Sequence, residues 1–211
     1  MKKFISELLG TYIMVFFGTG AIVINDISGG SIGHIGISIS FGLAVCVVIY
    51  AFVHISGAHI NPAVSIAFSF TDRYEKKNLP VYILGQCLGA ILASATLLLM
   101  FGDHPNLGAT LPMGSWEQSF ILEIILTFVL MLIILLVSQN DKVKNYIAPA
   151  VGGIVLLEAL VAGPISGASM NPARSLGPAL VSGEINSLWI YLVAPIIGAV
   201  LASYCWRALD K

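Results

Sequence analysis

The chain has 211 residues, of which 57% are apolar and 10% are charged, and its formal net charge is −1 at pH 7. Soluble domains carry about 25% charged residues. This composition therefore excludes an ordinary water-soluble surface, and the balanced charge argues against a nucleic-acid partner. Apolar runs of roughly 20 residues account for the difference. The sequence predicts an all-α membrane protein with several spans.

Six apolar runs are close to the ~20 residues that a ~30 Å hydrocarbon core requires. In chain order they cover residues 4–24, 35–55, 79–101, 120–137, 146–162 and 188–205. Three cysteines fall inside them, and we interpret these as small packing residues rather than as disulfides or metal ligands: Cys46, Cys87 and Cys205. No cofactor is predicted.

Basic residues predict the orientation of the spans. Nine of the ten fall on one side of the six-span arrangement: Lys2, Lys3, Arg73, Lys76, Lys77, Lys142, Lys144, Arg207 and Lys211. Because Lys and Arg concentrate in cytoplasmic loops, that side and both termini are predicted to be cytoplasmic, in a plasma (inner) membrane. The tenth, Arg174, falls at membrane depth, where a charge is tolerated mainly beside a water-filled cavity.

The chain also repeats itself. Residues 55–65 (ISGAHINPAVS) and 165–175 (ISGASMNPARS) share eight of eleven residues, and residues 82–94 match residues 191–203 at six of thirteen positions. Each copy contains three spans, which is an odd number, so the second copy is predicted to enter the membrane inverted. We expect one domain over residues 1–211, with repeat 1 at about 4–101 and repeat 2 at about 117–206.

A short apolar stretch follows the asparagine of each repeated segment, at residues 62–70 and 172–181. Asn is a favoured N-cap and Pro a favoured first helical residue. Asn61 and Asn171 are therefore predicted to begin half-helices of ~14–15 Å, about half a bilayer. Inversion brings the two N-termini together near the midplane, where their partial positive charges repel cations, protons included.

The glycine-containing lead-in before each asparagine is predicted to be extended chain that lines water, since unpaired backbone is not tolerated against lipid. The lead-in carbonyls would form a ladder of acceptors, from Gly57, Ala58, His59 and Ile60 in one copy and from Gly167, Ala168, Ser169 and Met170 in the other. With the two asparagine amides as donors, this predicts a narrow path for neutral, hydrogen-bonding solutes.

The doubled motif Asn61-Pro62-Ala63 and Asn171-Pro172-Ala173 resembles the major intrinsic protein family, the aquaporins and aquaglyceroporins, and the resemblance extends from Glu7 to Ala202. It implies a right-handed bundle of six transmembrane helices plus two re-entrant half-helices, with a pore through each protomer of a homotetramer. It also implies that Glu7 and Glu123, which occupy equivalent places in the two copies, brace the re-entrant loops.

Pores of this family narrow near the outer mouth at four positions, which correspond here to Phe41, Ala159, Ala168 and Arg174. Water-selective members typically carry His at the second position and Thr or Cys near the third, so the two alanines imply a wider, more apolar constriction. Residues 162–179 are similar to the nodulin-26-like branch and its bacterial relatives. That branch is associated with glycerol, urea and undissociated metalloid acids such as arsenous and boric acid.

Several assignments stay open. A mainly water-selective pore is the alternative within the family, and an inverted-repeat secondary transporter is a more distant one; no catalytic site is predicted. His54 is expected to line the inner pore or to bond loop backbone. Glu158 is expected to bond the outer loop or to pair with Arg174, and His34 and His104 are placed in outer loops.

Overall fold

The computed structural model describes residues 1–71, 75–102 and 104–209, and every regular element in those ranges is helical. Arg73 and Lys211, two of the residues that predict orientation, lie outside these ranges. In chain order the helices are α1 (Lys2–Ile27), α2 (Gly33–Ser56), α3 (Pro62–Ser69), η1 (Lys76–Asn78), α4 (Leu79–Phe101), α5 (Trp116–Gln139), η2 (Lys144–Tyr146), α6 (Ile147–Ser166), α7 (Pro172–Ser182) and α8 (Leu188–Leu209). Six of them are long and apolar enough to cross a membrane, as predicted, so the chain is an integral multi-pass membrane protein.

The fifth span ends later than the predicted residue 162, because the hydrogen bond that a proline inside it cannot make is replaced by a side chain. α6 continues through Pro164 to Ser166. Proline has no N–H to donate to the carbonyl of Leu160, and His34 Nε2 lies 2.7 Å from that oxygen instead. His34 therefore belongs to α2 and fastens α2 to α6, which corrects its prediction as a loop residue.

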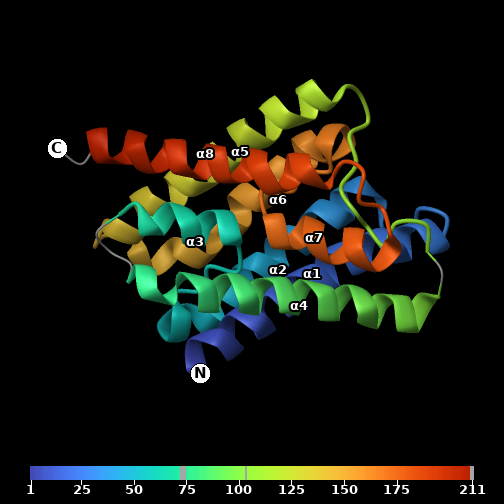
Figure 1. Ribbon diagram of the computed structural model, residues 1–211, viewed down its shortest axis with the longest axis horizontal. Coiled ribbons are helices and arrows are strands. Elements are labelled where there is room, and N and C mark those ends of the chain that lie inside the picture. Colours follow the sequence, from blue (N-terminus) through green and yellow to red (C-terminus); the bar gives the residue numbers. More distant parts are fainter. Residues whose placement is uncertain (72–74, 103, 210–211) are drawn as a thin grey trace.

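The spans pack in pairs that follow the repeat. α1 lies along α4 and α5 lies along α8, while α2 and α6 join the two copies. The two half-helices, α3 and α7, lie end to end in the middle of the bundle between α4 and α8 (Figure 1). Each half-helix contacts the last span of the other repeat, so neither repeat closes without its partner. The start of α1 and the end of α8 lie towards the same end of the bundle (Figure 1).

Glycines allow the paired spans to approach closely, as small residues do between membrane helices. A Cβ on Gly89 of α4 would collide with the Leu8 carbonyl of α1. The equivalent Gly198 of α8 meets the Ile124 carbonyl of α5 in the same way. The α1–α4 and α5–α8 pairs are therefore held at a distance that a larger side chain does not permit.

A single added methyl group tests this packing. We expect Gly198→Ala to lower the thermal unfolding midpoint in detergent, because overpacking against backbone costs about 1–3 kcal/mol. The matched control is Gly153→Ala in α6, where, apart from its chain neighbours and the backbone of its own helix, no heavy atom of the described residues lies within 4 Å of the added Cβ. There alanine should leave the midpoint unchanged or raise it, and equal midpoints for the two variants would contradict the packing argument.

Candidate functional site

A cavity of about 810 Å³ runs between the two repeats. Its lining begins at Lys144 and Asn145, beside the start of α6, passes Asn61 and Asn171 near the middle, and reaches Arg174. Spans from both repeats and both lead-ins contribute walls, most of which are apolar. The half-helices therefore open into a continuous internal path and not into solid core.

The asparagines begin the two half-helices. Asn61 Oδ1 accepts from the Ala63 N–H at 2.9 Å, and Asn171 Oδ1 accepts from the N–H groups of Ala173 at 3.0 Å and Arg174 at 3.3 Å. α3 ends at Ser69 and α7 at Ser182, so each differs by one residue from the predicted 62–70 and 172–181. The N-termini of both helices point at the middle of the cavity, where each contributes a partial positive charge.

The same two amides tie the lead-ins to each other. Asn61 Nδ2 donates to the Met170 carbonyl and Asn171 Nδ2 donates to the Ile60 carbonyl, both at 2.8 Å. An amide nitrogen carries two hydrogens, so one hydrogen of each asparagine remains for a molecule in the cavity. The cross-bonds hold these two donors in fixed positions on opposite sides of the path.

A buried carboxylate supports the first lead-in. Glu7 Oε1 accepts from Ser56 Oγ at 2.6 Å and from the His59 N–H at 3.0 Å, and Oε2 accepts from the Ile60 N–H and Gln86 Nε2, both at 2.7 Å. These bonds satisfy backbone donors that would otherwise be orphaned at membrane depth.

The second lead-in repeats the arrangement. Glu123 Oε1 accepts from Ser166 Oγ and the Ser169 N–H, and Oε2 accepts from the Met170 N–H, all at 2.8 Å. Glu7 and Glu123 thus occupy the positions that the family resemblance implied for bracing residues.

Both lead-ins follow an unusual backbone path. φ is positive at Ala58 (47°) and Ile60 (45°), and equally at Ala168 (43°) and Met170 (54°). Such a conformation is costly for residues other than glycine. It persists here because N–H groups of each lead-in are bonded to a buried carboxylate, and it exposes the backbone to the cavity instead of folding it into a helix.

The four side chains predicted at the constriction belong to the same cavity. Phe41, Ala159, Ala168 and Arg174 all line it, and the Arg174 guanidinium carbon lies 4.9 Å from the Phe41 ring centroid. Arg174 Nη1 donates to the Gly108 carbonyl at 2.7 Å. Sequence reasoning missed Gly108, because one glycine in a loop carries no signal that its carbonyl faces an arginine from a distant segment.

For three residues the structure differs from the expectation drawn from the sequence. His54 is exposed and does not line the cavity, because it follows the lining residue Val53 by one position and so points about 100° away around α2. Gly167, predicted in the carbonyl ladder, is also absent from the lining and packs on Thr110. Glu158 is only 5% exposed, yet within the described ranges neither carboxylate oxygen has a hydrogen-bond partner, and no ion pair joins it to Arg174.

The hydrogen bonds from the second lead-in to the Glu123 carboxylate predict an effect on stability. Glu123→Gln replaces one accepting oxygen with an NH₂ donor that faces a donor, so at least one buried partner loses its bond at a cost of about 1–3 kcal/mol. We expect a clearly lower unfolding midpoint in detergent. Glu117→Gln, on the exposed first turn of the same helix, is the matched control and should not shift the midpoint. Equal midpoints for both variants would show that the carboxylate does not hold the lead-in.

Comparisons with known proteins agree with this geometry. The sequence profile of the family described as Major intrinsic protein matches residues 1–206. The chain is 50% identical to Aquaporin NIP1-1 of Zea mays, over 99% of this chain and 75% of that protein, and 43% identical to Nodulin-26 of Glycine max, over 100% and 80%. Its fold is similar to the crystal structure of the aquaglyceroporin from Plasmodium falciparum, with a TM-score of 0.90 and 29% identity over 99% and 96% of the two chains. The chain therefore belongs to the major intrinsic protein family, as its doubled Asn-Pro-Ala motif and its inverted pair of half-helices predict.

Proposed function

We propose that this protein is a passive channel for small uncharged solutes, namely glycerol, undissociated metalloid acids such as arsenous or boric acid, and water, and that it excludes ions and protons. It acts as a channel and not as an enzyme. The observation that carries the proposal is that Phe41, Ala159, Ala168 and Arg174 all line one cavity, which is also lined by the asparagines that begin the two half-helices.

The charges of the lining support the exclusion of cations. The described residues that line the cavity include no Asp or Glu. The permanently charged side chains among them are Lys144 and Arg174, and both are cationic. A cation that sheds its water in this path meets two positive helix ends and no counter-charge, and uncompensated burial of a charge is very costly. A neutral solute instead exchanges hydrogen bonds with Asn61 and Asn171.

The constriction supports the choice of solute. Phe41, Ala159 and Ala168 supply apolar walls, while Arg174 supplies a cationic donor on the remaining side. A polyol such as glycerol has a carbon backbone that can contact the apolar walls and hydroxyl groups that can accept hydrogen bonds from Arg174. The named relatives, aquaporins and an aquaglyceroporin, favour the same class.

Four further assignments belong to the proposal. We assign Glu7 and Glu123 as braces of the lead-ins, and the carbonyls of the lead-in residues other than Gly167 as acceptors for passing solutes. The orientation, with cytoplasmic termini in the plasma (inner) membrane, is supported by the basic-residue pattern. A homotetramer is supported by family membership and by the many large apolar side chains on the outer surface, which suit contact with lipid or with another subunit.

A mainly water-selective pore remains the second candidate, because Phe41 and Arg174 together narrow one side of the constriction. Stopped-flow light scattering on proteoliposomes, with water, glycerol and arsenous acid measured in one preparation, separates the two. Rapid glycerol and arsenous acid entry above that of protein-free liposomes supports the wider pore. Rapid water entry alone supports the second candidate, and flux that required an ion gradient would instead indicate a transporter.

Ala159 provides the variant that tests the constriction. Ala159→His adds bulk and a donor beside Phe41, so glycerol and arsenous acid permeability should fall by about tenfold or more while water permeability is retained. Ala159→Gly and Ala159→Val form a graded series in which glycerol permeability should decrease with side-chain size. Unchanged glycerol entry in the folded Ala159→His protein would remove Ala159 from the constriction.

A further inference from the structure

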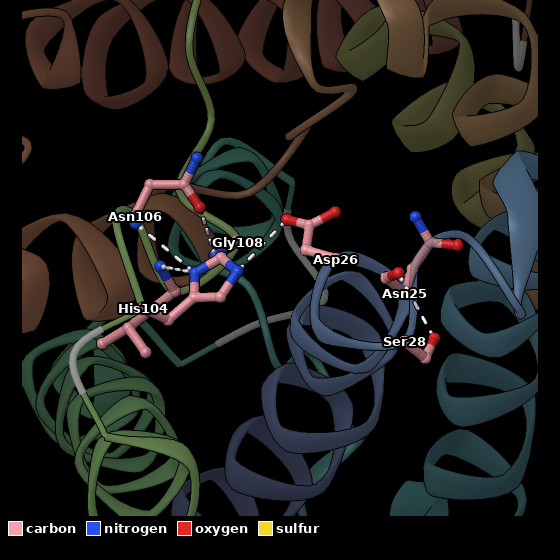
Figure 2. A network of polar contacts seen from close by, with 7 residues as sticks. Asn25, Asp26, Ser28, His104, Asn106 and Gly108 are labelled. Carbon is pink, nitrogen blue, oxygen red and sulfur yellow. Dashed lines mark hydrogen bonds and ion pairs between the residues drawn. The ribbon is translucent and has the colours of Figure 1, made fainter.

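A histidine that the proposed pore does not use lies at the base of the loop that holds Arg174. The His104 side chain is only 5% exposed, and its Nε2 lies 3.2 Å from Asp26 Oδ2 at the end of α1. Its Nδ1 lies 3.0 Å from the Leu107 backbone nitrogen, and this N–H can only donate. Nδ1 is therefore the unprotonated acceptor, and Nε2 carries the proton that is donated to Asp26. Figure 2 shows the ring beside Asp26, with Asn106 and Gly108 of the following loop on its other side.

The loop that follows His104 has a strained conformation. Leu107 and Gly108 both have positive φ, at 50° and 74°. Leu107 is fully buried, its N–H is bonded to His104, and Asn106 Oδ1 accepts from the Gly108 N–H at 3.0 Å. These contacts hold a conformation that leucine otherwise avoids.

The same conformation directs one carbonyl at the constriction. Gly108 packs on Thr19 of α1 so closely that a Cβ would lie 2.9 Å from the threonine Cβ. Its carbonyl oxygen is 2.7 Å from Arg174 Nη1. Within the described ranges, Arg174 Nε is buried without a hydrogen-bond partner, and the Phe41 ring faces the guanidinium at 4.9 Å. The Gly108 carbonyl is thus the fixed acceptor that holds the guanidinium to one side of the path.

We propose that His104 and Asp26 are positioning residues for selectivity: Asp26 fixes the His104 tautomer, His104 fixes the 104–108 turn, and the turn holds Arg174 through the Gly108 carbonyl. This inference rests on the proposed channel function. When the turn relaxes, the released guanidinium donors find their new partners among solutes and water in the cavity. Arg174 then leans into the constriction and obstructs glycerol more than water, because glycerol has the larger cross-section.

Substitutions at His104 separate the two bonds of the ring. Asn carries its amide oxygen at the place of Nδ1 and keeps the acceptor for Leu107, but it loses the reach to Asp26. Ala loses both. Ser28 bonds Asn25 (Figure 2) and Ser31 in the neighbouring turn. Within the described ranges its hydroxyl does not bond to Arg174 or to the 104–108 turn, so Ser28→Ala provides the control.

The test measures glycerol and water permeability of each variant in proteoliposomes by stopped-flow light scattering. The glycerol-to-water permeability ratio should fall about threefold or more in His104→Ala. Loss of the His104 bond loosens the turn and so weakens the bond between the Gly108 carbonyl and the charged Arg174 guanidinium, and hydrogen bonds to charged groups are strong. It should be intermediate in Asp26→Ala, and close to wild type in His104→Asn and Ser28→Ala. This rescue distinguishes positioning from general stability. Asn fills less of the site than His, so a ratio close to wild type would come from the retained acceptor for Leu107 and not from restored packing.

Each outcome is decisive for one proposal. An unchanged ratio in folded His104→Ala overturns the positioning role, and a His104→Asn ratio as low as that of Ala overturns the assignment of Nδ1 as the essential acceptor. If His104→Ala does not elute as folded protein, the Asp26→Ala ratio decides, and an unchanged value there overturns the proposal. Absence of glycerol flux in the wild type would count against the proposed function and not against this inference.

Discussion

Backbone polarity at membrane depth is the constraint on which this structure depends. A channel needs exposed backbone carbonyls inside the bilayer, while a bilayer tolerates backbone only when its polar groups are satisfied. Glu7 and Glu123 resolve this conflict, because each carboxylate accepts hydrogen bonds from N–H groups of one lead-in and is not itself among the residues that line the cavity. The two carboxylates are thus structural groups whose value lies in the backbone conformation that they allow.

The inverted repeat turns one local arrangement into a complete path. A half-helix with its N-terminus at the midplane occupies only half the membrane, and its capping asparagine needs a partner for its amide. The second copy supplies both, since Asn61 bonds the Met170 carbonyl and Asn171 bonds the Ile60 carbonyl. The middle of the path is therefore symmetric, electropositive and rigid, which suits the passage of neutral solutes.

One of the positions at which the two copies diverge places a charge in the cavity on one side only. Arg174 in the second copy corresponds to Val64 in the first, and both line the cavity. The arginine that we assign to the proposed constriction is therefore contributed by α7 and has no equivalent in α3. A charge at this depth requires compensation. Arg174 bonds the Gly108 carbonyl and faces the Phe41 ring, and within the described ranges it makes no direct ion pair with a carboxylate. Its charge therefore remains effective inside the path.

The sequence by itself determined the six spans, their inversion, the two half-helices and the doubled motif, because each depends on hydrophobic length or on local capping chemistry. Only the tertiary structure decided that His54 points away from the cavity, that His34 replaces the donor lost at Pro164, and that Gly108 holds Arg174. His34 and Gly108 join segments that are distant in the chain, and no local pattern encodes such a contact. The direction of His54 follows from helical rotation only once the structure shows which face of α2 lines the cavity.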